Sequence, residues 1–164
     1  MRETGAMNEG GASTMGEGGL PPDAVDQIRA SNDAWHRRDL EATLAPYADE
    51  IEWDMSQAYL DGHVYRGMPA FRAYFEEVLG RWGQDEHRLE IEEILEVEGS
   101  STVVVHYRMS GRSRSGVPVD ARWVHVFEFR EGQIVRARNF TSLDAAMEAL
   151  GAARLAPLWE PTAG

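Results

Sequence analysis

The sequence lacks two reactive residue types altogether. Its 164 residues include no cysteine, and all 16 of its basic residues are arginine rather than lysine. Without cysteine the chain has no disulfide, no thiol nucleophile and no zinc–thiolate site. Without lysine it cannot form a Schiff base with a carbonyl substrate. Covalent catalysis through a thiol or a lysine amine is therefore excluded.

Long apolar runs and positive charge are also scarce. No apolar segment approaches the roughly 20 residues that span a bilayer. The first residues lack the basic region followed by an apolar region that marks a secretory signal. The net charge of −12 opposes binding to nucleic acid, because phosphate binding requires a basic surface. We therefore expect a cytoplasmic protein with no nucleic-acid partner and no membrane partner.

Motifs for cofactors are missing as well. No pair of histidines has the HExxH spacing of a zinc site. The glycines near the N-terminus neither follow a strand nor precede a lysine, as a phosphate-binding loop requires. The sequence therefore predicts no metal and no cofactor.

The residues that are present fit one compact domain with a short segment at each end. Residues 1–22 are rich in glycine, contain no aromatic residue and end in two prolines, which predicts a disordered leader. The chain is 43% apolar, which is enough for a core within residues 23–151. Residues 152–164 contain prolines, and we expect a coil tail there.

The first half of the domain predicts three helices and one short strand. Asp23 and Asp39 are expected to cap the first two helices, and Pro69 is expected to begin the third. Apolar residues recur at helical spacing over these segments. Residues 50–55 alternate as a strand does, and residues 56–67 are expected to form a loop.

The second half predicts four strands and a last helix. Polar and apolar residues alternate over residues 87–98, 101–112, 117–130 and 133–142, and turn residues separate these segments. Residues Leu143–Leu150 return to helical spacing. Helices followed by a run of strands indicate an α+β fold, in which three N-terminal helices pack on a curved, mostly antiparallel sheet.

Four motifs, in their order along the chain, resemble a known family. They are Arg38-Asp39-Leu40, the segment from Tyr47 to Asp54, Tyr65-Arg66-Gly67 and the closing hairpin from Phe127 to Val135. Over about residues 23–150 the sequence resembles the SnoaL-like branch of the nuclear transport factor 2-like superfamily. The resemblance implies a cone-shaped α+β barrel with a deep apolar pocket, usually as a homodimer. It does not define the reaction, because this fold hosts several chemistries as well as pure binding.

The resemblance also suggests which positions carry chemistry. Ketosteroid isomerases of this superfamily place their general base, an aspartate, at the end of the first strand, which matches Asp54. His125 stands where those enzymes have an acid that holds the oxyanion, and Ser31 stands near their helix tyrosine. Steroid isomerisation is therefore not expected. Epoxide hydrolysis of the limonene type is not expected either, because Arg138-Asn139 replaces the arginine–aspartate pair of the last strand.

Three residues are the predicted catalytic groups. Asp54 would accept a proton from carbon next to a carbonyl, or else it caps the loop after its strand or faces water. His125 would polarise a carbonyl or move a proton, or else it is a core histidine bonded to a backbone carbonyl. Asn139 would donate a hydrogen bond to a substrate oxygen.

Aromatic residues and one serine are predicted to line the substrate pocket, with packing in the core as the alternative. These residues are Ser31, Trp35, Tyr47, Trp53, Tyr59, Tyr65, Trp123 and Phe127.

The hairpin between the second and third of the four strands allows two registers. If Arg114-Ser115 forms the turn, His106 lies opposite Trp123, and His106 and Arg108 share a face with His125. A shift of one residue instead exposes His106 and Arg108 to solvent, and this alternative is favoured.

Two functions follow from these residues. The first is a cofactor-independent acid–base enzyme of the cyclase, isomerase or dehydratase type, acting on a small apolar carbonyl-bearing metabolite such as a polyketide. The second is a module of the same fold that binds a small ligand or dimerises without catalysis.

A homodimer through the sheet is expected in addition, because a second sheet face would be too apolar to contact water. That face is assigned to Val103, Val105, Tyr107, Val124 and Val126.

Overall fold

The computed structural model describes residues 19–113, 115–151 and 153–162, with the backbone alone at residues 82–86. Most of the predicted leader lies outside the described residues. The helices are α2 (Ala24–His36), α3 (Leu40–Leu44), α4 (Met68–Arg81) and α5 (Leu143–Leu150). The strands are β1 (Tyr47–Asp54), β2 (Val64–Arg66), β3 (Trp82–Val97), β4 (Thr102–Ser113), β5 (Pro118–Arg130), β6 (Gln133–Phe140) and β7 (Leu155–Trp159).

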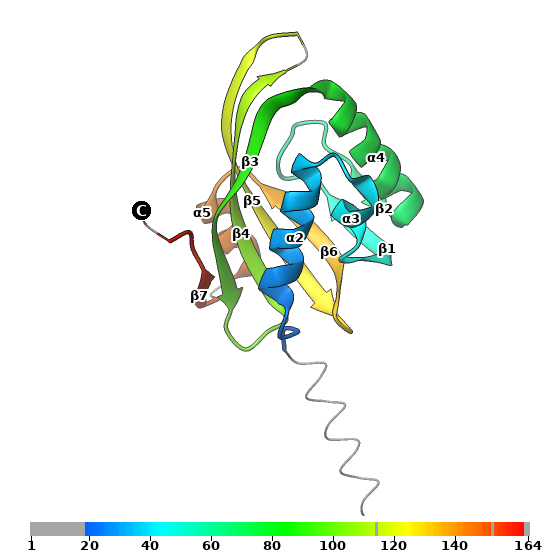
Figure 1. The fold of residues 1–164 in the computed structure, drawn as a ribbon. Coiled ribbons are helices and arrows are strands. Elements are labelled where there is room, and N and C mark those ends of the chain that lie inside the picture. The colour runs from blue at the N-terminus through cyan, green and yellow to red at the C-terminus, as the bar shows by residue number, and fades with distance from the viewer. Residues whose placement is uncertain (1–18, 114, 152, 163–164) are drawn as a thin grey trace, which may run out of the picture.

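The seven strands form one curved sheet that does not close. Its order is β2-β1-β6-β5-β4-β3-β7, and only the β1–β6 pair is parallel among these described strands. Helices α2, α3 and α4 lie on one side of the sheet and α5 lies on the other (Figure 1). The α+β fold with a curved, mostly antiparallel sheet is therefore confirmed.

Helices α2 and α3 differ in how their N-termini are capped. Asp39 caps α3 as predicted, because its Oδ1 accepts a hydrogen bond from Ala42 N at 3.1 Å. The predicted cap at Asp23 is wrong. Its backbone is not extended (φ −101°, ψ 19°), and its carboxylate accepts from the Gln27 side chain instead of a backbone N–H.

Two apolar clusters pack on the two faces of the sheet. Val103, Val105 and Tyr107 belong to the cluster that includes residues of α2 and α4, whereas Val124 and Val126 belong to the cluster that includes Ala146 of α5. All five are buried within one chain. The single apolar face predicted for dimerisation is therefore wrong, since alternate residues of a strand point to opposite faces.

The β4–β5 hairpin adopts the favoured register, which turns His106 and Arg108 away from the face of His125. The exposure expected for His106 is wrong, because its side chain is only 23% exposed. Tyr107 lies opposite Trp123, and His106 lies opposite Val124. Ser113 N donates to Val117 O at 2.9 Å, so the loop is one residue longer than Arg114-Ser115 alone would give. Gly116 takes the positive φ (85°) that loops of this length place on glycine.

Two strands form where the sequence predicts irregular structure. Within the predicted loop, β2 pairs with β1, and Trp53 lies opposite Tyr65. Within the predicted coil tail, β7 pairs with β3, and Val97 lies opposite Leu155. The Trp159 ring also packs on the Arg29 guanidinium at 4.8 Å, which ties the tail to α2.

Candidate functional site

A cavity of about 360 Å³ lies between the inner face of the sheet, α4 and the loop after β1. Most of its lining is apolar or aromatic, as in small-molecule sites. The lining residues are Trp35, Trp53, Met55, Tyr59, Tyr74, Phe75, Val78, Arg81, Leu89, Met109, Ser113, Val119, Trp123, His125 and Asn139.

His125 is held in the cavity wall by aromatic rings. The Trp53 ring stands edge-on to the imidazole at 5.4 Å, and the Tyr107 ring lies at 4.7 Å. Burial among these rings lowers the pKa of His125 to about 3, because the charged form loses its hydration. His125 is therefore neutral at pH 7. Its Nδ1 is buried and has no hydrogen-bond partner among the described residues.

Asn139 lies beside His125, because the two residues are opposite each other in the β5–β6 pair. Its side chain is almost completely buried, at 1% exposure. Asn139 Nδ2 donates to the backbone oxygen of Asp54 at 3.1 Å. This contact orients the amide, since a carbonyl oxygen only accepts hydrogen bonds. Asn139 Oδ1 is left buried, without a partner in the described part of the chain.

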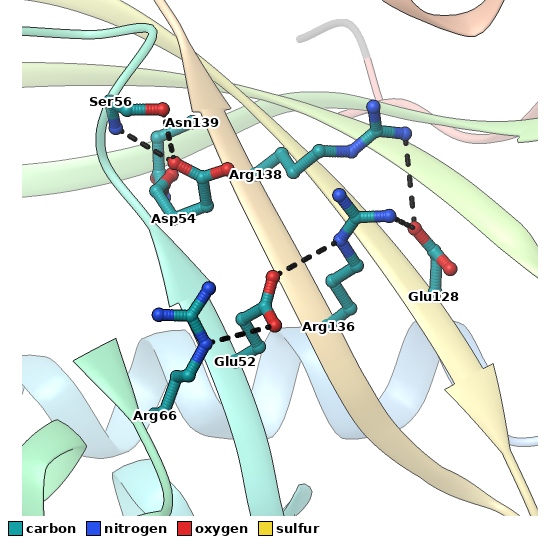
Figure 2. A network of polar contacts seen from close by, with 8 residues as sticks. All are labelled: Glu52, Asp54, Ser56, Arg66, Glu128, Arg136, Arg138 and Asn139. Carbon is teal, nitrogen blue, oxygen red and sulfur yellow. Dashed lines mark hydrogen bonds and ion pairs between the residues drawn. The ribbon is translucent and has the colours of Figure 1, made fainter. Parts of the chain in front are cut away.

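The Asp54 side chain lies on the other face of β1. Trp53 and Met55, its neighbours in sequence, are buried and line the cavity, so alternation along the strand turns Asp54 outward. Its Oδ1 accepts hydrogen bonds from Ser56 N at 2.9 Å and Ser56 Oγ at 2.6 Å (Figure 2). The alternative reading, in which Asp54 caps the loop after its strand, describes this geometry. The expected position at the mouth of the apolar cone is not what the structure has.

The outer face around Asp54 carries paired charges. Glu52 lies 3.6 Å from Arg66 Nε and 3.7 Å from Arg136 Nε, while Glu128 contacts Arg136 and Arg138 at 3.4 and 3.8 Å (Figure 2). Each carboxylate is shared between two guanidinium groups. These charges are balanced on the surface and do not face the cavity.

The loop after β1 brings Tyr59 to the cavity. Met55 O accepts from Ala58 N and Tyr59 N, which turns the chain back on itself at the end of the strand. Gly62 passes so close to Met55 that a Cβ there would lie 2.1 Å from Met55 O. The Tyr59 ring then packs on Trp123 at 5.4 Å. Partial burial raises the pKa of the Tyr59 phenol, which stays protonated at neutral pH.

Arg81 is the one lining residue, among those described, that is charged at pH 7. It ends α4, next to residue 82, which pairs with Ser113 of β4. Its guanidinium forms an ion pair with Glu77, one turn earlier on the helix, and both side chains are exposed. The cavity therefore has a cationic group at the end formed by Arg81 and Ser113.

The structure brings together six of the predicted site residues. Trp35, Trp53, Tyr59, Trp123, His125 and Asn139 all line the cavity. The other predicted residues are absent from its described lining. These are Asp54, Ser31, Tyr47, Tyr65 and Phe127.

The remaining predicted residues pack in the core or beside it. Ser31 Oγ donates to Thr43 O at 2.6 Å, which joins α2 to α3. Tyr47 and Phe127 are buried, with ring centroids 6.1 Å apart, and burial raises the pKa of the Tyr47 phenol. Tyr65 packs on Tyr74 at 4.7 Å. For these residues the core alternative describes the structure.

Several lining residues were not predicted. Tyr74, Phe75 and Val78 belong to the apolar residues that recur at helical spacing along α4, and Arg81 follows Val78 at the same spacing. That spacing is the signal that could have identified Arg81. Met109 and Val119 depend on the hairpin register, and no local signal identifies them.

Neither a metal site nor a membrane span is found in the described residues. No group of three or more histidine, cysteine, aspartate or glutamate side chains there could hold a metal ion. No described helix is both long and apolar enough to cross a bilayer.

Comparison with known proteins agrees with this fold. The family model of the SnoaL-like domain matches residues 28–137. A search of curated proteins found no match.

Three solved structures are similar to the chain. A nuclear transport factor 2-like protein of unknown function from Burkholderia pseudomallei is 25% identical, with a TM-score of 0.62 over 78% of this chain and 97% of that one. TerC, co-crystallised with polyporic acid, is 24% identical, with a TM-score of 0.60 over 76% and 95%. A Pseudomonas putida protein named provisionally as a polyketide cyclase is 18% identical, with a TM-score of 0.57 over 74% and 93%. The family match and the shared fold together show that the chain belongs to the SnoaL-like domain family of the nuclear transport factor 2-like superfamily.

Proposed function

We propose that the chain is a cofactor-independent enzyme of the cyclase or isomerase type, acting on a small, largely apolar molecule with an enolisable carbonyl. His125 is the residue that moves the proton. The observation that supports this role is an imidazole in an apolar cavity with Nδ1 buried and without a partner among the described residues. Its position beside Asn139 places two polar groups at one end of the cavity.

The chemistry follows from the neutral state of His125. A neutral imidazole has one nitrogen that can accept a proton. It takes the proton from the carbon next to the carbonyl, and the electron pair left behind forms an enolate. The negative enolate beside the new imidazolium favours the charged form that burial disfavours. Return of the proton to another carbon completes an isomerisation and restores the neutral imidazole.

Asp54 has a different part in this proposal from the one expected. Its carboxylate is bonded to Ser56 on the outer face, whereas its backbone oxygen accepts from Asn139 Nδ2. Asp54 thereby orients Asn139 through the main chain. The carboxylate is not required to reach the substrate.

Exchange of carbon-bound hydrogen tests the proton transfer directly. 2-Tetralone is a small apolar ketone, and NMR in D2O reports how fast deuterium replaces its hydrogens next to the carbonyl. We expect the protein to accelerate this exchange and His125→Gln to lose most of the acceleration. A general base contributes about 10²–10⁴-fold, and the low pKa of His125 places it at the lower end of that range. His63→Gln is the matched control, because His63 is exposed and outside the described lining.

Equal exchange rates with the wild type and His125→Gln would disprove the role of His125. Circular dichroism of both variants separates a loss of activity from a loss of fold.

A ligand-binding module without catalysis is the second candidate. The outward-facing carboxylate of Asp54 favours it, because the described lining then contains no carboxylate. The co-crystal of TerC with polyporic acid supports small-molecule binding by this fold. Binding of 2-tetralone without accelerated exchange would favour this candidate over the enzyme.

A further inference from the structure

The two ends of the cavity differ in chemistry. On β5 the lining residues run from His125 through Trp123 to Val119. These positions span about 20 Å of strand, since each residue adds about 3.3 Å. Asn139 lies opposite His125, and Ser113 follows Arg112, which lies opposite Pro118. The cavity therefore extends from an Asn139 end to an Arg81 end along the hairpin.

The Asn139 end offers a hydrogen-bond acceptor. Asn139 Nδ2 is bonded to Asp54 O, which leaves the buried Oδ1 as the polar atom without a partner among the described residues. A ligand that places an ether or another pure acceptor against Oδ1 leaves both oxygens unpaired. A ligand hydroxyl supplies the missing donor, so a ligand that carries one should bind more tightly than one that leaves this buried acceptor unpaired.

The Arg81 end offers a positive charge. Arg81 is exposed at 63% of its side chain, and its ion pair with Glu77 is equally exposed, so a second carboxylate can approach the guanidinium. The whole chain carries a net charge of −12, which repels anions at long range. A preference for an acidic ligand would therefore have to come from Arg81 itself.

We infer that the cavity selects elongated, largely aromatic molecules with a hydroxyl at one end, bound to Asn139, and an acidic group at the other, bound to Arg81. The inference rests on the proposed function only in taking this cavity as the ligand site. It does not depend on proton transfer by His125.

Four biphenyl probes test the preference for a hydroxyl at one end and an acidic group at the other, with affinities measured by isothermal titration calorimetry. They are 4′-hydroxybiphenyl-4-carboxylic acid, the analogue without the hydroxyl, the analogue without the carboxylate, and biphenyl itself. With the wild type we expect the doubly substituted probe to bind most tightly. Loss of the hydroxyl should weaken binding about fivefold or more, and loss of the carboxylate about threefold, because the ion pair is exposed.

Variants assign each preference to its residue. Arg81→Gln should abolish the preference for the carboxylate and leave the preference for the hydroxyl intact. Arg112→Gln is the matched control, because Arg112 is exposed on the same hairpin but outside the described lining. Asn139→Leu should abolish the preference for the hydroxyl. If Asn139→Leu does not fold, the wild type alone tests the hydroxyl preference, through the difference in affinity between the probes with and without the hydroxyl.

Equal binding of all four probes, or no binding of any, would overturn the inference. An equal loss of the preference for the carboxylate in Arg81→Gln and Arg112→Gln would also overturn it, because the preference would then come from the overall charge of the protein and not from contact with Arg81. If His125-dependent exchange of 2-tetralone persisted in any of these cases, the proposed enzyme would stand and only the ligand class would be wrong.

Discussion

At the scale of single residues, His125 and Asn139 each keep one buried polar atom without a hydrogen-bond partner among the described residues. Each is fixed by its strand and by its neighbours rather than by bonds to all of its polar atoms. A buried polar atom without a partner lowers stability, and such atoms concentrate where a protein binds or transforms a ligand. The structure thus retains at this site an arrangement that packing alone would disfavour.

The pKa of His125 makes stability depend on pH. Its folded-state value of about 3 lies below the value near 6.5 of an unfolded histidine. Below pH 6.5 the unfolded chain therefore binds more protons, and the free energy of unfolding falls as the pH falls toward 3. At about pH 5 the loss due to this residue is about 2 kcal/mol. Urea unfolding of the wild type at about pH 7 and pH 5 measures the total change.

His125→Gln isolates the contribution of this residue, because glutamine does not titrate. Its loss of stability between the two pH values should be smaller than that of the wild type by about 2 kcal/mol. The exposed His63→Gln variant should keep the wild-type dependence. Identical pH dependence in all three proteins would contradict burial of a neutral His125.

At the scale of elements, α5 protects the outer side of the sheet. Ala146 of α5 packs in the cluster that contains Val126 and Phe140, so the helix covers apolar strand residues. The helix is short, and its start depends on Ser142, whose Oγ accepts from Ala145 N at 3.1 Å. Loss of the Ser142 N-cap should therefore also weaken the packing of α5 on the outer apolar cluster.

Ser142→Ala should lower the free energy of unfolding by about 1 kcal/mol, the usual effect of losing a helix N-cap. Thr141→Ala is a close control, because Thr141 is exposed and does not cap the helix. We expect the control to change stability by less than about 0.5 kcal/mol. Equal effects of the two substitutions in denaturant titrations would refute the capping role.

Local sequence patterns predicted most of these elements, and long-range pairing explains the failures. The stripe of α4, the cap of α3 and the four long strands depend on residues near in sequence. In contrast, β7 is a strand because the edge of β3 is available to pair with it. The hairpin register likewise depends on how Ser113 pairs across the loop.

The site was harder to predict than the fold for the same reason. Trp53 and His125 could be identified as wall residues because the residues two positions away, on the same face of each strand, are apolar. The orientation of Asp54 depends on which face of β1 meets the helices, and Tyr47 and Phe127 fill the space beneath α4. A pattern of residue types identifies a buried position but does not distinguish a cavity wall from the core beside it.

At the scale of the whole molecule, the outer face of the sheet that a second copy could contact carries charged residues, where the sequence predicts an apolar face. The apolar residues that the sequence assigns to a dimer interface are buried. The outer face of the sheet instead presents Glu52, Arg66, Arg136 and Glu128 in ion pairs. A dimer through this face would place these charged side chains in the interface.

We still expect a homodimer, with a mass twice the 18.3 kDa of the chain in sedimentation equilibrium. Its dissociation constant should rise between about 0.1 M and 1 M salt, because the screening length falls from about 10 Å to about 3 Å. A mass of 18.3 kDa at every concentration would rule the dimer out. A dimer insensitive to salt would place the interface elsewhere.

Three of the five tryptophans, Trp35, Trp53 and Trp123, line the cavity. Their indole rings surround the volume that a ligand would fill. Intrinsic tryptophan fluorescence should therefore report on binding in the cavity. A conjugated aromatic guest seated among these rings would absorb the light they emit, and occupancy would register as quenching without any label. Unpurified extracts from the native host could be screened in this way.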